Sequence, residues 1–269
     1  MPTFDKEYFN LGYLDALSYK DTFVHRLDPG IKVIATFLFV LTVVSFPKYE
    51  LSGLLPFFFF PVLFVSSGDI PAKFILKKIL LVSPFALFVG IFNPFLDRDI
   101  MYSFYGINIS AGWISFLSIF IKYVLTISAA LLLIATTSFP GVCYGLQKLG
   151  LPEIFVSQLL FLYRYIFVLA EETMKIVRAR DMRSFGRTGK GLKTFINLIS
   201  VLFIRTVEKS ERIYRAMLSR GFDGKIRSAK KYSISGVDII FILTTLALLY
   251  LFRKYDIAWQ LGNLAKKII

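Results

Sequence analysis

The stretch that decides the fold is ISAGWISFLSIFIKYVLTISAALLLIATT, residues 109–137, an apolar run with a single charged residue, Lys122. A helix needs about 20 predominantly apolar residues to cross the hydrocarbon core of a bilayer, so this run can cross with a tilt. Of the chain's 269 residues, 56% are hydrophobic and 17% aromatic. A soluble domain of this size cannot bury so much apolar surface, and we predict an integral membrane protein.

Other apolar runs extend this prediction to the whole chain. The fold class is predicted to be all-α, a polytopic integral membrane protein with about five transmembrane helices and long amphipathic cytoplasmic helices. The remaining spans are predicted at 31–46, 51–66, 79–96 and 236–252. The predicted domains are a cytoplasmic or interfacial arm (1–30), a four-span region (31–137), a cytoplasmic helical region (138–232) and a last span with its tail (233–269).

The positive charge is concentrated in one segment. The net charge is +14, and residues 172–231 hold 16 of the 32 basic residues but only 5 acidic ones. Because basic loops stay cytoplasmic, we expect this segment inside the cell. The predicted last span, 236–252, then crosses the membrane and places the C-terminus outside. The basic tail LAKKII, residues 264–269, opposes that placement but carries less charge. The many apolar spans make nucleic acid a poor explanation of the charge.

The cytoplasmic region is predicted to hold long helices. Residues 153–170 are apolar except for Arg164, and an arginine inside a span is costly. We therefore favour a helix along the cytoplasmic face, with Arg164 snorkelling to its edge. Amphipathic helices are expected to run on to about Met182 and then from about Leu192 to Arg220, where Gly221 ends the helix.

The sequence gives little support for a catalytic site or a metal site. The chain has one histidine, His25, and one cysteine, Cys143, whereas a metal site needs three or four convergent ligands. GRTGKG, residues 186–191, lacks the spacing of a Walker A phosphate loop. No nucleophile–base pair is recognisable. We predict no catalytic residues, no metal site and no cofactor.

Two arginine-centred segments remain. RARDMRS surrounds Arg180 and MLSRGFDG surrounds Arg220. Two helices joined by a short turn could bring both to one surface, where an arginine fork could enter a groove of another protein. Ordinary positive-inside charge explains them equally well on physical grounds.

At these residues the sequence resembles the transmembrane T component of energy-coupling-factor (ECF) transporters, in the cobalt/nickel, CbiQ-like branch. That family carries two Ala-Arg-Gly motifs on cytoplasmic coupling helices. The motifs stand here as Ala179-Arg180-Asp181 and Ser219-Arg220-Gly221, with Asp181 in place of Gly and Ser219 in place of Ala. Further similar segments are HRLDPGIK (25–32, with Gly30 where Arg is usual), QLLFLYRYIFVL (158–169) and FIRTVEKSERIYRAMLSRGFDG (203–224).

The resemblance implies a non-catalytic energy-coupling subunit of an ATP-driven importer, for cobalt or nickel ions. Its partners would be two ABC-type ATPases, docked on the two motifs, a membrane substrate-binding S component, and the lipid bilayer. The location would be the cell (inner) membrane of a bacterium or archaeon. The alternatives are an ordinary ABC permease or an integral-membrane enzyme of unknown chemistry.

Overall fold

The computed structural model describes residues 17–97, 100–104, 107–183, 192–224, 226 and 234–255. Within them the chain forms two compact units. We call residues 17–145 with 234–255 the membrane unit, and residues 146–226 the hairpin unit. Most of the predicted N-terminal arm, the tail after residue 255 and the GRTGKG segment lie outside the described residues. The four predicted domain boundaries remain a prediction.

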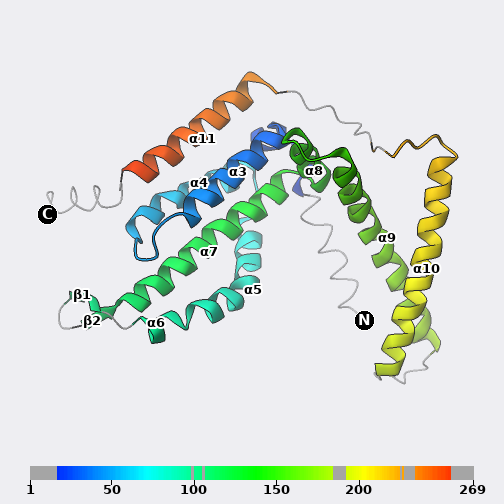
Figure 1. Cartoon of the computed structure of the whole chain (residues 1–269), viewed down its shortest axis with the longest axis horizontal. Helices are drawn as coiled ribbons and strands as arrows, with labels where there is room; N and C mark the ends of the chain where they lie inside the picture. Colours follow the sequence, from blue (N-terminus) through cyan, green and yellow to red (C-terminus); the bar gives the residue numbers. More distant parts are fainter. Residues whose placement is uncertain are drawn as a thin grey trace. The chain divides into compact units, whose positions relative to one another are not determined.

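Helix α7 (Ala111–Thr136) is the centre of the membrane unit. It contacts α3 (Pro29–Val44), α4 (Phe59–Ser67) and α5 (Ala72–Gly90), which surround it in Figure 1. Small side chains let membrane helices approach closely. The buried small residues of α7 are Ala111, Gly112, Ser115, Ser118, Ser128, Ala129, Ala135 and Thr136.

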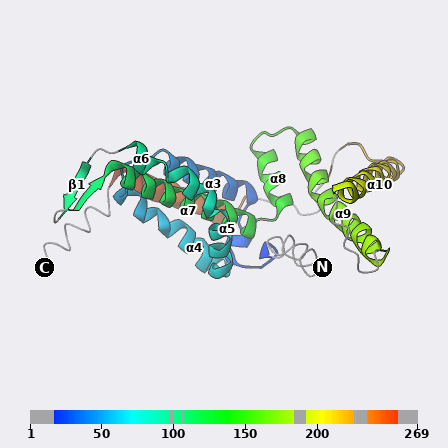
Figure 2. The same cartoon turned by 90° about the horizontal axis from the view of Figure 1, so that it is seen from below.

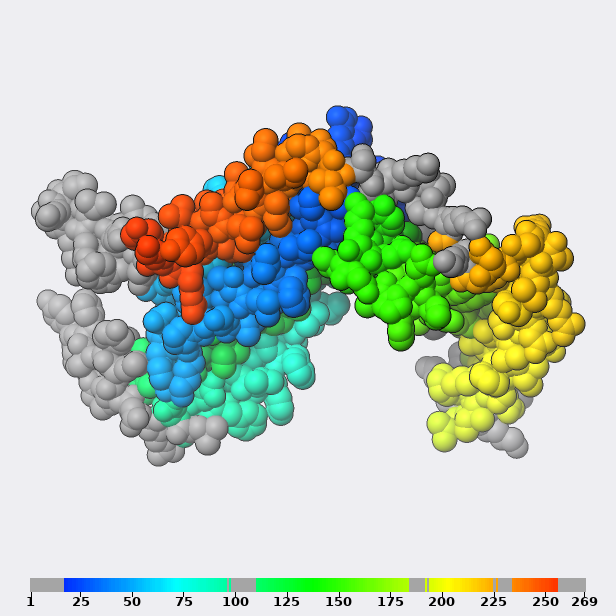
Figure 3. Space-filling model, turned by 45° about the horizontal axis from the view of Figure 1, so that its top comes forward, coloured from blue at the N-terminus to red at the C-terminus, as the bar shows by residue number. Residues whose placement is uncertain are grey.

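The last helix of the chain packs against the first ones. Helix α11 (Gly236–Lys254) contacts α3 and the 3₁₀ helix η1 (Ser52–Phe58). Figure 3 shows it, orange to red, lying over the blue N-terminal helices. Leu249 of α11 joins Phe39 of α3 in one buried apolar cluster. The membrane unit is therefore closed by segments about 200 residues apart in sequence.

A buried polar cluster fixes the start of α3. The Asp28 carboxylate caps the helix by accepting from the Gly30 N–H at 2.9 Å, and the Asp28 N–H donates to Asp238 of α11 at 2.8 Å. The Lys32 ammonium donates to the Thr136 carbonyl at the end of α7, also at 2.8 Å. Buried polar groups need such partners, and here they tie together the ends of three helices.

The described residues contain four helices long and apolar enough to cross a membrane, by length and composition. These are 72–95, 111–136, 153–183 and 236–254, and the apolar helices at 29–44 and 52–67 are shorter. The all-α, polytopic fold class is thereby confirmed. Helix α9 (Glu153–Arg183) meets the same criteria, so its expected position along the cytoplasmic face remains a prediction.

The third span was predicted at 79–96, but α5 begins at Ala72, so that Lys73, Lys77 and Lys78 lie in its first turns. The loop after that span contains α6 (Asn93–Leu96) and an antiparallel hairpin of β1 (Ile100–Phe104) and β2 (Ile107–Ser110). Short helices α2 (Phe23–Arg26) and α8 (Phe139–Lys148) complete the description.

The hairpin unit is built from α9 and α10 (Leu192–Leu218). Phe161, near the start of α9, meets Phe222, just after α10, with ring centroids 5.8 Å apart. Further along α9, Glu172 faces Arg205 and Lys209 near the middle of α10. The two helices are thus antiparallel, and Figure 2 shows them crossing.

Candidate functional site

The second arginine motif lies on a sharply ended helix. The Phe222 N–H bonds to the Met217 carbonyl at 3.1 Å and the Gly221 N–H to the Leu218 carbonyl at 3.0 Å. This pair of bonds is the Schellman C-cap, which needs a left-handed residue. Gly221 supplies it with φ of 79°. The helix therefore stops directly after Arg220, as the sequence predicted.

The motif is exposed while its neighbour is anchored. Ser219, Arg220 and Gly221 are all exposed, and no atom lies within 4 Å of a Cβ built on Gly221. Phe222 is half-buried and packs edge-on against Phe161. The aromatic contact holds the end of α10 on α9, so the Arg220 guanidinium is presented to solvent from a fixed support.

The first motif has a different setting. Ala179, Arg180 and Asp181 lie in the last turns of α9 and are half-buried, next to the buried Ile176. They are followed by the exposed Met182 and Arg183. This motif is therefore part of a regular helix, which continues past Asp181 to Arg183.

The structure does not bring the two arginines together. Because α9 and α10 are antiparallel, Arg220 lies near Phe161 while Arg180 lies towards the other end of α9. At ~1.5 Å per residue, Arg180 is ~28 Å along α9 from Phe161. The expectation of a single surface fails because both motifs are at C-terminal helix ends, and such ends point in opposite directions in an antiparallel pair.

Glu172 joins the two helices between the motifs. Its carboxylate, whose side chain is 15% exposed, lies 3.5 Å from Arg205 and 3.4 Å from Lys209. Two ion pairs also form between residues four positions apart within one helix, Glu171–Lys175 in α9 and Glu211–Arg215 in α10. Sequence reasoning missed the Glu172 contacts, although an acidic residue following the apolar part of α9 was a signal for them.

One side of α10 is apolar and exposed. Its hydrophobic residues recur every three or four positions, which places them on one face. In a soluble protein an exposed stripe of this kind marks a contact with another protein or with a membrane. The exposed hydrophobic residues on this face of α10 are Leu192, Phe195, Ile196, Ile199, Phe203 and Val207.

The remaining candidates have structural settings. The His25 ring contacts the Thr22 hydroxyl at 2.7 Å and the Leu17 carbonyl at 3.1 Å. Cys143 is buried, and burial raises the pKa of its thiol to about 11. Arg164 is exposed on α9. In the part of the chain that the structure describes, no three His, Cys, Asp or Glu side chains are grouped to hold a metal ion.

The HRLDPGIK segment packs closely against a glycine of α8. A Cβ on Gly145 of α8 would lie 3.1 Å from the Gly30 backbone and equally close to the Pro29 carbonyl carbon. The start of α3 and the α8 helix therefore meet backbone to backbone. This close contact lies immediately before the point where the chain leaves the membrane unit.

Comparison with known proteins places these features in a family. A family model described as cobalt transport protein, CbiQ, matches residues 20–232. An uncharacterised protein of Methanocaldococcus jannaschii is 29% identical over 87% of this chain and 82% of its own length. The energy-coupling factor transporter transmembrane protein EcfT of Ruminiclostridium cellulolyticum is 24% identical over 86% of this chain and 95% of its own.

A third relative matches a shorter part. The putative fused cobalt transport protein CbiMQ of Methanocorpusculum labreanum is 41% identical over 90 residues, 33% of this chain and 15% of that protein. The family model covers well over half of the sequence, including both arginine motifs. On this ground, the chain belongs to the CbiQ family of cobalt transport proteins.

Proposed function

We propose that this chain is the transmembrane coupling subunit of an ECF-type importer, and that Arg180 and Arg220 each dock on one of two ABC-type ATPases. The observation that carries the proposal is the presentation of Arg220. It is exposed, it ends α10, and Phe222 anchors the end of the helix on α9. The relatives named as transporter transmembrane proteins support the general role.

Two docking points at opposite ends of one hairpin suit two ATPase subunits. A single ATPase groove cannot hold both arginines when they are ~28 Å apart along α9. The Glu172 contacts with Arg205 and Lys209 brace the hairpin between them. Motion of either ATPase would then move the hairpin as one body.

The other partners follow from surface chemistry. The exposed apolar face of α10 suits a separate S component in the membrane, or the bilayer surface itself. The positive charge of residues 172–231 supports a cytoplasmic position for the coupling region, in a bacterial or archaeal cell. Cobalt or nickel is the proposed cargo, because the matching family model and the CbiMQ relative are described as cobalt transport proteins. The ion itself would be selected by the S component.

The test removes the arginines one at a time and together. Truncating one partner of a buried, hydrogen-bonded charge pair costs about 2–5 kcal/mol, and ~3 kcal/mol corresponds to roughly a hundredfold in affinity. Arg220→Ala and Arg180→Ala should each weaken ATPase co-purification or uncouple hydrolysis from uptake. The double variant should abolish metal uptake in membrane vesicles. Arg→Lys variants should also lose ATPase binding where the planar guanidinium makes several hydrogen bonds at once.

Two controls separate docking from general positive charge. Arg212→Ala removes an exposed arginine two turns earlier on α10, and Arg187→Ala removes one outside the described residues. Both variants should retain the ATPases and transport normally. Parent-level transport by the Arg180→Ala/Arg220→Ala variant would refute the proposal and leave positive-inside charge as the better account.

A further inference from the structure

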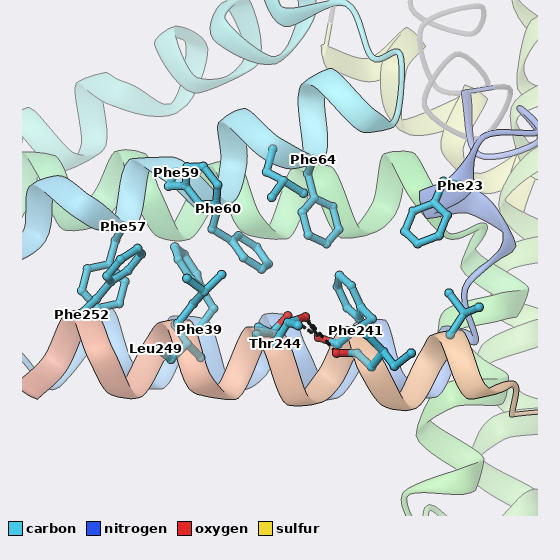
Figure 4. A pocket seen from close by; sticks show the side chains of 15 residues that line it. Phe23, Phe39, Phe57, Phe59, Phe60, Phe64, Phe241, Thr244, Leu249 and Phe252 are labelled. Carbon is cyan, nitrogen blue, oxygen red and sulfur yellow. Dashed lines mark hydrogen bonds between the residues drawn. The ribbon is translucent and has the colours of Figure 1, made fainter.

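The membrane unit has an apolar cavity between α11 and the η1–α4 segment. Its volume is about 260 Å³, and Figure 4 shows side chains from both sides pointing into it. It is open at the surface of the unit rather than sealed in the core. Aromatic rings dominate its lining, among them Phe57, Phe59, Phe60, Phe64, Phe241 and Phe252. We call it the phenylalanine groove.

The polar atoms along the groove are already used. The Thr244 hydroxyl donates to the Ile240 carbonyl and the Thr245 hydroxyl to the Phe241 carbonyl, each at 2.9 Å. A hydroxyl has one proton to donate, so neither threonine offers a donor to a guest. The groove therefore suits a hydrocarbon chain rather than a polar ligand.

The dimensions also suit a hydrocarbon chain. A cavity of ~150 Å³ holds benzene, so this groove has room for a longer, thin apolar molecule. From Val237 to Phe252 the groove follows α11 for ~22 Å. One leaflet of the hydrocarbon core is ~15 Å thick, so the groove is long enough for a single acyl chain lying beside α11.

Two cations lie at one end of the groove. Beyond Phe252, the Arg253 guanidinium is 4.3 Å from the Phe46 ring centroid and donates to the Ser45 carbonyl at 3.4 Å. The Lys122 ammonium, from α7, donates to the Phe46 carbonyl. The charges of Lys122 and Arg253 interact with each other, and Glu50 is the acidic group that acts on Lys122.

Part of this arrangement has a structural role. Both cations donate to carbonyls at the C-terminal end of α3, where a positive charge interacts favourably with the negative end of the helix dipole. These bonds use few of the available donors, since a guanidinium has five N–H groups and an ammonium three. Like charges held together repel, and an anion beside both would remove that repulsion. The site of the two cations adjoins the groove, because Phe252 precedes Arg253 and packs against Phe57, with ring centroids 5.7 Å apart.

We propose that the groove binds one anionic phospholipid, with its phosphate beside Lys122 and Arg253 and an acyl chain along the phenylalanine side chains. The lipid would fill the space between α11 and α4 and complete the packing of the last helix on the first ones. This site is independent of the docking of ATPases on the arginine motifs.

The test uses a photoactivatable lipid on the full chain. The protein is reconstituted in phosphatidylcholine nanodiscs with a trace of phosphatidylglycerol carrying a diazirine on one acyl chain. After illumination, adducts are expected on peptides of α4 and α11 around Phe60 and Thr244. Unlabelled phosphatidylglycerol should compete at least fivefold better than added phosphatidylcholine. Equal competition by both lipids, or no adducts in these helices, would overturn the proposal. The second result would also follow if the chain's own tail filled the groove.

Paired variants test each half of the site. Thr244→Trp puts a bulky ring into the groove and should lower labelling at least fivefold, whereas Leu81→Trp on the exposed face of α5 should not. Arg253→Gln should remove the preference for phosphatidylglycerol. Lys77→Gln, which removes an exposed cation on α5 instead, should preserve the preference. If Arg253→Gln misfolds, Thr244→Trp still decides the matter, because unchanged labelling in that variant contradicts the proposal.

Discussion

At the scale of single residues, His25 is held as a neutral imidazole. Its Nε2 faces the Leu17 carbonyl, which can only accept, so Nε2 carries the proton and Nδ1 accepts from the Thr22 hydroxyl. Burial lowers the pKa of His25 from 6.5, more than backbone hydrogen bonds with Ala135 and Leu17 raise it, and the nearby charges of Lys32 and Lys20 lower it further. The ring thus has a structural function that depends on its remaining uncharged.

The lowered pKa of His25 gives a pH prediction. In acid the unfolded chain binds a proton at this ring more readily than the folded chain. Stability contributed by neutral His25 is therefore present above pH 6.5 and lost as the pH falls through the lower folded-state pKa. The melting temperature in detergent should fall between pH 7.5 and 5.5 by more in the parent than in His25→Gln. Identical pH profiles would contradict the prediction.

Gly221 gives a second prediction at this scale. Its φ of 79° is left-handed, and a side chain there costs about 1–2 kcal/mol. Gly221→Ala should speed amide exchange at the end of α10 roughly tenfold, since ~1.4 kcal/mol is a factor of ten. It should also weaken ATPase co-purification. Gly221→Asn should be milder, because Asn tolerates this conformation.

The control for Gly221 is Gly236→Ala. Gly236 begins α11, and a Cβ there would have no atom within 4 Å. This variant should leave exchange and co-purification unchanged. Hydrogen exchange with mass spectrometry measures the effect on α10, and a Gly221→Ala variant with parent-like protection would show that the C-cap does not hold Arg220 in place.

At the scale of elements, the contact of α8 with the start of α3 is sensitive to a single methyl group. A Cβ on Gly145 would meet backbone atoms of Gly30 and Pro29 at 3.1 Å, and backbone cannot rotate away. Gly145→Ala should therefore lower the free energy of unfolding by about 1–3 kcal/mol. The matched variant Gly141→Ala meets mainly Thr137 and Ser138 side chains, which can adjust. Thermal unfolding should show a clearly larger loss for Gly145→Ala.

Periodicity and hydropathy predicted the long helices well. The expected span at 109–137 is α7, and the expected end of α10 at Gly221 is correct because glycine is the residue that a left-handed C-cap needs. The start of α5 was missed, since lysines beside an apolar run look like a loop although their stems suit a helix.

The candidate site was predictable in its residues but not in its arrangement. The motifs at Arg180 and Arg220 were found from local sequence, and their docking role remains a prediction. Their separation depends on α9 and α10 being antiparallel, which contacts between the helices decide. The Glu172 contacts span 33 and 37 positions in sequence, a distance at which no local pattern operates. For the same reason, the groove between α4 and α11 was not foreseen.

At the scale of the whole molecule, topology remains a prediction. Gly189→Cys should react with a membrane-impermeant maleimide only from the cytoplasmic side, and Asn263→Cys only from outside. Both positions lie outside the described residues. The native Cys143 adds little background, because it is buried and its pKa of about 11 leaves little thiolate at neutral pH. Labelling of Gly189→Cys from outside would show that α9 crosses the membrane.

The Glu172 contacts have a mechanical consequence for the proposed coupling. They divide the hairpin into two lever arms of unequal length, ~12 Å along α9 from Glu172 to Arg180 and ~16 Å along α10 from Lys209 to Arg220. Equal forces applied at the two arginines do not balance about that fulcrum. Two identical ATPases closing together would therefore exert a net torque on the hairpin, so that a symmetric power stroke produces a tilt.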